Sequence, residues 1–167
     1  MAKSNALIIF IKNPVLGKVK TRLAEGIGDK NALKVYHHLL KRTREITKEL
    51  DDTERFVFYS DYLPTKDEWS EDYFEKMLQK GNNLGEKIIH AFKQVFREDF
   101  EKVMLIHPDC PKLTHPVIEK AFRELDKHDV AVGPTEDGGY YGIAIKKPMP
   151  FLFDREYSTG KVFEDTM

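Results

Sequence analysis

Hydrophobic residues along the chain fall into two patterns, and the first is a set of short apolar runs. Residues 6–11, 56–59 and 102–106 are almost continuously apolar. Runs of this length are typical of strands that are buried on both faces, as in a parallel sheet. Two further apolar runs, over residues 130–132 and 140–145, also predict strands. Residues 73–79 fit a strand and a helix equally well.

The second pattern is a recurrence of apolar residues at spacings of three and four. It predicts a helix over residues 33–50, with Asp29 placed to cap its start. A second helix is predicted over residues 84–96, after a turn rich in Gly and Asn. A third is predicted over residues 114–125, with Pro116 in its first turn, where proline is tolerated.

Between these elements, residues 12–28 and 60–72 are polar and are predicted to be loops. Strands that alternate with helices indicate an α/β fold with a mainly parallel sheet. In such sheets, ligands bind at the carboxyl ends of the strands. This rule directs attention to the segments that follow residues 6–11, 102–106 and 130–132.

Composition narrows the class of protein. The chain has 167 residues, of which 41% are hydrophobic and 33% charged, as expected of a folded domain rather than a disordered chain. The apolar run over residues 6–11 is too short for a membrane span, which needs about 20 residues. A single cysteine, Cys110, excludes an internal disulfide. We therefore expect a cytoplasmic protein without a membrane span.

Charge is distributed unevenly along the chain. The formal net charge is −1, yet the first 24 residues contain five basic residues and no acidic residue. The overall balance argues against a nucleic-acid-binding protein. The basic N-terminal part is compatible with a local site for a small anion.

The loop after residues 6–11 carries the first group of candidate residues. Its glycine allows close approach of a ligand to the backbone, and its cations are suited to phosphates. The spacing matches neither the Walker loop nor the G-x-G-x-x-G dinucleotide motif. The alternative is a solvated loop with ordinary surface lysines. The candidates for phosphate binding are Lys12, Gly17, Lys18, Lys20 and Arg22.

The segments after residues 102–106 and 130–132 carry acidic residues. Asp109 is placed to hold Mg²⁺ or Mn²⁺, since hard cations take carboxylate and phosphate oxygens. The alternative is a turn residue that bonds its own backbone. Glu136 and Asp137 precede Gly138 and Gly139, and either acid is suited to bind hydroxyl groups or act as a general base. The alternative there is a simple hairpin turn.

Several short motifs occur in a fixed order. They are F-x-K-x-P-x-x-G-x-V-K-T-R-L over residues 10–23, L-G-E over 84–86, D-C-P-x-L-T over 109–114, G-P-x-x-D-G-G-Y-Y over 133–141 and S-T over 158–159. Together they resemble the DUF2064 family, which is grouped with GT-A-type glycosyltransferases and nucleotidyltransferases.

The resemblance implies a three-layer α/β/α sandwich of the nucleotide-diphospho-sugar transferase (GT-A) type, with nucleotide phosphates near residues 12–22. It implies that Asp109 is the metal-binding aspartate and that Asp137, Gly138 and Gly139 line the acceptor side. The expected function is a metal-dependent glycosyltransferase that uses a nucleotide-sugar donor and a small-molecule acceptor. In this interpretation Asp137 is the catalytic residue, Glu136 helps to bind the acceptor, and the cofactor is Mg²⁺ or Mn²⁺.

Two other functions stay open. One is a nucleotidyltransferase that releases pyrophosphate, like the phospholactate guanylyltransferases or molybdenum-cofactor enzymes, although the L-x-G-G-x-G opening of many of these is missing. The other is a non-catalytic nucleotide-binding domain.

The chain also departs from the family pattern. His107-Pro108, Asn82-Asn83 and Tyr157 replace its usual residues, and relatives continue beyond the position of Met167. We expect residues 1–167 to form a single domain that lacks the C-terminal segment of its relatives. Whether a homo-oligomer covers a strand edge is left open.

Overall fold

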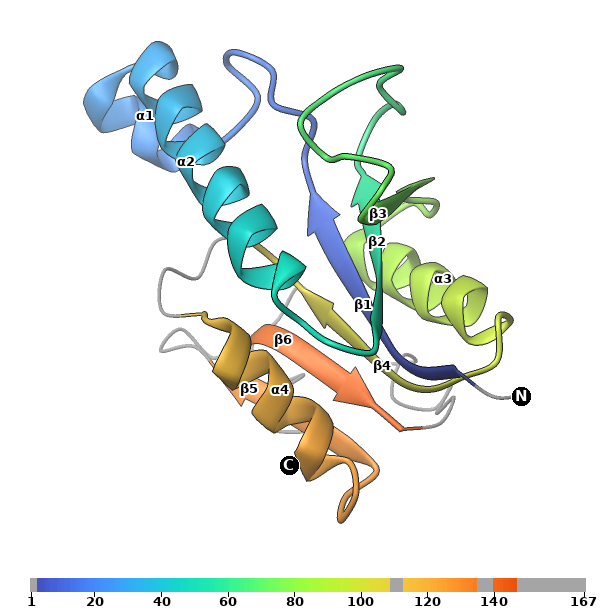
Figure 1. Cartoon of the computed structure of the whole chain (residues 1–167). Coiled ribbons are helices and arrows are strands. Elements are labelled where there is room, and N and C mark those ends of the chain that lie inside the picture. The colour runs from blue at the N-terminus through green and yellow to red at the C-terminus, as the bar shows by residue number, and fades with distance from the viewer. Residues whose placement is uncertain (1–2, 109–112, 135–139, 147–167) are drawn as a thin grey trace.

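The computed structural model describes residues 3–108, 113–134 and 140–146 of the chain (Figure 1). Its centre is a sheet with the strand order β3-β2-β1-β4-β6-β5. The strands are β1 (Lys3–Ile11), β2 (Thr53–Tyr59), β3 (Phe74–Leu78), β4 (Phe100–Ile106), β5 (Val130–Pro134) and β6 (Tyr140–Ile145). β6 is antiparallel to both of its neighbours, whereas the other paired strands are parallel. The predicted mainly parallel sheet is thus confirmed.

Helices cover both faces of the sheet (Figure 1). They are α1 (Thr21–Ile27), α2 (Asp29–Lys48), α3 (Leu84–Phe96) and α4 (His115–Glu124). α3 packs against one face through an apolar side that includes Ile88 and Phe92. α2 and α4 pack against the other face, through residues that include Leu40 and Ile118. This arrangement confirms the three-layer α/β/α sandwich. None of the helices within the described residues is long and apolar enough to cross a membrane.

Three local expectations are resolved. The predicted loop over residues 12–28 contains α1, a helix in which no residue is buried. The predicted cap residue Asp29 is wrong: Gly28 is the N-cap of α2, and Asp29 occupies the first turn. Gly28 has a φ of 89°, which favours glycine, because the chain turns sharply there between two helices. The ambiguous segment around residues 73–79 forms the edge strand β3.

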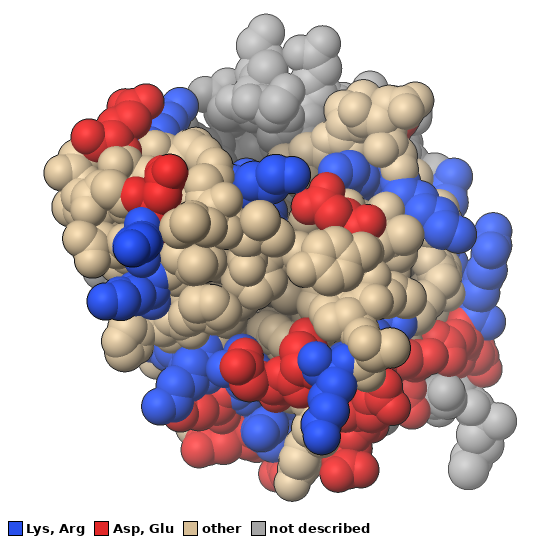
Figure 2. All heavy atoms as spheres, turned by 90° about the horizontal axis from the view of Figure 1, so that it is seen from above, with Lys and Arg blue, Asp and Glu red and all other residues tan. Residues whose placement is uncertain are grey.

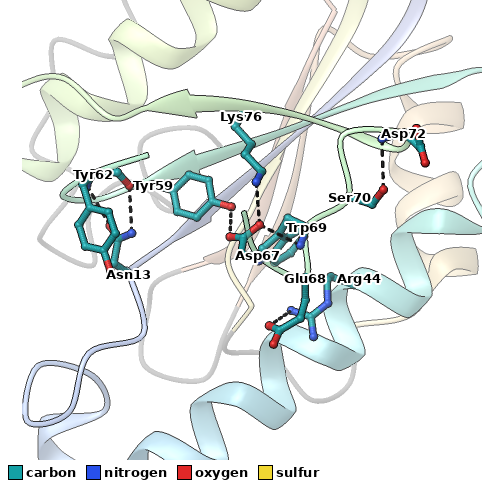
Figure 3. Close-up of polar contacts among 10 residues, drawn as sticks. All are labelled: Asn13, Arg44, Tyr59, Tyr62, Asp67, Glu68, Trp69, Ser70, Asp72 and Lys76. Carbon is teal, nitrogen blue, oxygen red and sulfur yellow. Dashed lines mark hydrogen bonds and ion pairs between the residues drawn. The ribbon is translucent and has the colours of Figure 1, made fainter. Parts of the chain in front are cut away.

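The loop after β2 is held down by a half-buried carboxylate, Asp67 (Figure 3). Asp67 accepts hydrogen bonds from the Tyr59 hydroxyl and, at 3.1 Å, from the Trp69 backbone N–H. The Lys76 Nζ atom forms an ion pair with Asp67 Oδ1 at 2.8 Å. Burial and the hydrogen bond to Asp67 raise the pKa of Tyr59 above its ordinary value. Tyr59 is therefore a neutral donor, and the loop has a fixed path along the sheet.

Candidate functional site

A cleft of about 620 Å³ opens at the carboxyl ends of the parallel strands. Its lining comes from segments that are far apart in the sequence: the end of β1, the start of α1, the residue after β3, the start of α3 and the residue after β4. The location agrees with the rule that α/β sheets bind ligands at this edge. Figure 2 views the molecule from this end and shows Lys and Arg side chains around the middle of the face.

Three cationic residues line the cleft: Lys12, Lys20 and Arg22. Lys12 follows β1 directly, and Arg22 lies in the first turn of α1. Lys20, the N-cap of α1, has a left-handed backbone with a φ of 49°. The turn into α1 thus brings cations from both ends of the loop into one cleft. Three of the five residues predicted to bind phosphate are therefore brought together.

The other two predicted residues, Gly17 and Lys18, do not line this cleft. They belong to a tight turn in which the Lys18 backbone N–H donates to the Val15 carbonyl at 3.0 Å. Lys18 is exposed outside the cleft, Val19 is buried, and Lys20 lines the cleft. Gly17 has a φ of 81°, so the turn requires its conformational freedom.

Tyr36 was part of the predicted apolar stripe, but it also lines the cleft. It lies on α2, is only 4% exposed, and accepts a hydrogen bond at its hydroxyl from the Lys12 backbone N–H at 2.7 Å. A buried N–H at the end of a strand needs such a partner. Tyr36 therefore fixes the path of the chain where it leaves β1. The spacing in the sequence identified the buried ring but not this role of the hydroxyl.

Gln79 is a second residue that the sequence analysis did not select. It directly follows β3, and its Nε2 atom donates to the carbonyls of Ile11 and Phe58 at 2.9 Å each. Its backbone N–H donates to the Tyr59 carbonyl, also at 2.9 Å. Gln79 thereby ties the ends of β1, β2 and β3 together below the cleft. The signal that could have found it is a polar residue at the end of a strand, but the sequence left residues 73–79 ambiguous between strand and helix.

Asn13 joins the loops that follow β1 and β2 (Figure 3). It is 2% exposed, and its Oδ1 atom accepts from the backbone N–H groups of Asp61 at 2.9 Å and Tyr62 at 3.2 Å. Its Nδ2 atom donates to the Tyr62 carbonyl at 3.0 Å. Because Asn13 is adjacent to Lys12, this clamp also holds the backbone beside the cleft.

His107 follows β4 and lines the cleft. Its ring stands edge-on to the ring of Phe10, with the centroids 6.0 Å apart. This contact packs His107 against the end of β1.

The acidic candidates lie outside the described residues. These are Asp109, Glu136 and Asp137, together with Gly138 and Gly139. Within residues 3–108, 113–134 and 140–146, no group of three or more His, Cys, Asp or Glu side chains is arranged to hold a metal ion. The strands that lead to the acidic candidates are described, however. β4 is parallel to β1, with Ile106 beside Ile9, so the chain leaves β4 at the edge where the cleft opens.

A family model matches residues 44–159, which is more than half of the chain. The chain belongs to the DUF2064 family. The family is described as uncharacterized proteins conserved in bacteria, and the match includes the β4 and β5 segments with their acidic loops. No curated protein matches this DUF2064 chain.

Solved structures resemble the DUF2064 chain over nearly its whole length. A candidate nucleotide-diphospho-sugar transferase from Desulfovibrio desulfuricans G20 has a TM-score of 0.83 and 28% identity, over 99% of this chain and 76% of its own. The 4-diphosphocytidyl-2C-methyl-D-erythritol synthase of Anaerococcus prevotii has a TM-score of 0.61 and 9% identity, over 98% and 82% of the two chains. A cytidylyltransferase from Leptospira borgpetersenii serovar Hardjo-bovis has a TM-score of 0.56 and 14% identity, over 99% and 73%. The last two show the shared fold alone.

The Tyr36 contact can be tested by removing one oxygen atom. We expect Tyr36→Phe to lower the free energy of unfolding by about 1 kcal/mol, because the Lys12 N–H loses its acceptor. Urea denaturation at an unchanged slope measures this effect. Tyr73→Phe is the matched control, since Tyr73 is 50% exposed, and it should change stability little. Equal stability of the two variants would contradict the role given to the Tyr36 hydroxyl.

Proposed function

We propose that this chain is a glycosyltransferase that takes a sugar from a nucleotide-diphospho-sugar and passes it to a small-molecule acceptor. The observation that carries the proposal is the convergence of Lys12, Lys20 and Arg22 in one cleft at the carboxyl edge of the sheet. The likeness to the candidate sugar transferase from D. desulfuricans supports the choice of donor. This DUF2064 cleft has the charge that a diphosphate needs.

In this proposal the cations act on the leaving group. When the bond between the sugar and the diphosphate breaks, negative charge accumulates on the departing nucleoside diphosphate. Cations already held in place lower the barrier by stabilising that charge. Arg22 is suited to bind two phosphate oxygens at once, whereas Lys12 and Lys20 act as point charges. Tyr36 and Asn13 keep the backbone of residues 12 and 13 in position for this contact.

We further propose that Asp109 holds Mg²⁺ or Mn²⁺. The described part of the cleft contributes cationic and neutral side chains, and β4 ends at the edge where the cleft opens, which supports a metal carboxylate from the segment after β4. One carboxylate together with phosphate oxygens suits the coordination habits of magnesium. When bound, the metal supplies additional charge neutralisation at the diphosphate.

Asp137 is proposed as the catalytic residue on the acceptor side. A carboxylate there would orient the acceptor hydroxyl and remove its proton as the hydroxyl attacks the sugar. Glu136, Gly138 and Gly139 are proposed to contact the acceptor. β5 ends at Pro134, and β6 starts at Tyr140, so these residues connect two strands at the edge where the cleft opens.

A matched pair of variants tests the phosphate site. We expect Arg22→Gln to weaken binding of nucleoside diphosphates about 10-fold or more, because it removes a charge-assisted hydrogen bond. Lys18→Gln is the control: it removes one positive charge from the same loop, outside the cleft. Titration calorimetry with ADP, CDP, GDP and UDP measures the affinities. An equal loss of affinity in both variants would mean that only the net positive charge of the loop matters, and it would contradict the proposed site.

The metal proposal has its own test. Thermal shifts are measured with the best nucleoside diphosphate, with and without Mn²⁺, in the unmodified chain and in Asp109→Asn. A ligand present at 100 times its dissociation constant raises stability by about 2.7 kcal/mol, so the shift should be visible. We expect the manganese-dependent part of the shift to disappear in Asp109→Asn while the metal-independent part remains. A manganese-dependent shift that survives the substitution would remove Asp109 from the metal site.

Nucleotidyl transfer is the second candidate, because the fold is shared with a cytidylyltransferase and with a 4-diphosphocytidyl-2C-methyl-D-erythritol synthase. In that reaction the acceptor attacks the α-phosphate of a nucleoside triphosphate, and pyrophosphate leaves. We expect no pyrophosphate from CTP, GTP, ATP or UTP with sugar phosphates or small hydroxy acids as acceptors, and release of nucleoside diphosphate from a nucleotide-sugar. A coupled assay for pyrophosphate measures the first outcome. Pyrophosphate release would replace the glycosyltransferase proposal, and binding without turnover of either donor would indicate a non-catalytic nucleotide-binding domain.

A further inference from the structure

The helix α1 is weakly attached to the rest of the protein. It has seven residues, none of which is buried, and it packs on the start of α2. Leu23 and Ile27 are 36% and 40% exposed. Helices much shorter than about 12 residues are marginal in water unless tertiary packing stabilises them. Gly26, inside α1, lowers its helical stability further. α1 is therefore an element of low local stability.

Both ends of α1 are conformational turning points. Lys20 precedes it with a φ of 49°, and Gly28 follows it with a φ of 89°. Beyond these two residues the chain is anchored. Val19 is 2% exposed on one side, and α2 buries Ala32 and Tyr36 on the other. Residues 20–28 thus form a short arm between two anchored points, and a residue with positive φ stands at each end of it.

The arm carries part of the cleft. Thr21, Arg22 and Leu23 line the cleft from α1, and Leu84 lines it from the first residue of α3. Leu23 is 36% exposed and Leu84 is 40% exposed. Bringing the two leucines together would remove apolar surface from water. Because Arg22 lies on the same helix as Leu23, the same movement would shift its guanidinium within the cleft.

We propose that α1 closes toward α3 when a phosphate-bearing ligand occupies the cleft, so that binding of the ligand and ordering of α1 are coupled. The proposal rests on the proposed phosphate site of Lys12, Lys20 and Arg22. The proposed coupling is a population shift between open and closed positions of α1. The ligand binds the closed form more tightly and therefore increases the population of that form. A mutation that makes α1 more or less ordered must then change the affinity for the ligand in the same sense.

Hydrogen exchange provides the direct test. Backbone exchange is followed by mass spectrometry in the full chain, with and without millimolar inorganic pyrophosphate. We expect slower exchange over residues 21–28 when pyrophosphate is bound. Exchange over residues 115–124 of α4 should stay unchanged, because α4 contributes no residue to the cleft.

Two glycines provide a matched pair of variants. A Cβ atom added at Gly26 or at Gly28 meets no atom within 4 Å, so both methyl groups fit. They differ in backbone conformation, because Gly28 has a φ of +89° and Gly26 is helical. Gly26→Ala favours the helix, and we expect it to tighten pyrophosphate binding up to about fivefold. Gly28→Ala strains the joint, and we expect it to weaken binding.

These experiments distinguish failure of the proposed closure of α1 from failure of the proposed phosphate site. If pyrophosphate binds and Arg22→Gln weakens it, but exchange over residues 21–28 is unchanged and Gly26→Ala binds like the unmodified chain, closure is overturned and the phosphate site stands. If neither pyrophosphate nor any nucleoside diphosphate binds the unmodified chain, the phosphate site is overturned and closure with it. Gly26→Ala alone decides the question if Gly28→Ala does not fold.

Discussion

The burial of β1 on both faces of the sheet is the constraint on which the rest of the structure depends. Residues 6–9 are completely buried, and successive side chains pack alternately toward α3 and toward α2. Because β1 pairs in parallel with both β2 and β4, Ile11 lies beside Tyr59 and Ile9 beside Ile106. β1 and β2 therefore end side by side, and β4 ends beside Ile9, two residues before the end of β1. Segments distant in the sequence leave the sheet there together, and the cleft forms between them.

At the end of such a sheet, neutral side chains form hydrogen bonds with backbone groups that no neighbouring strand pairs. Backbone groups that leave a ladder lose their partners, and a buried one without a partner is costly. The Tyr36 hydroxyl accepts from the Lys12 N–H, and the Gln79 side chain donates to the Ile11 and Phe58 carbonyls. The Asn13 side chain accepts from the backbone of the loop after β2. Neutral groups thus hold the backbone below the cleft, and the cationic side chains are contributed separately by Lys12, Lys20 and Arg22. Position and charge are assigned to different residues.

This division of roles explains which features could be predicted from the sequence. The apolar runs of β1, β2 and β4 identified the core strands because full burial leaves a continuous signal. α1 was missed because none of its residues is buried. The antiparallel direction of β6 was not predicted, because a short apolar run does not indicate in which direction the strand runs.

At the site, composition identified the cations but not their arrangement. Lys18 and Lys20 are chemically equivalent in the sequence. Lys18 lies in the turn closed by its hydrogen bond to Val15, whereas Lys20 starts α1 and lines the cleft, and nothing in the composition distinguishes the two. Tyr36 and Gln79 escaped selection because their partners lie 24 and 68 residues away.

The order of strands also gives the proposed reaction a direction along the sheet. The cations of the described cleft belong to the segment that follows β1, whereas the carboxylates proposed for the metal and the acceptor follow β4 and β5. In the sheet, β4 is next to β1, and β6 separates β4 from β5. A donor diphosphate over β1, a metal beside β4 and an acceptor toward β5 would then follow the order in which the strands lie. The antiparallel β6 preserves this order, because the β5–β6 connection begins and ends at the edge where β1 and β4 finish. In the proposed reaction, the topology would thus give the donor and the acceptor separate places along the carboxyl edge of the sheet.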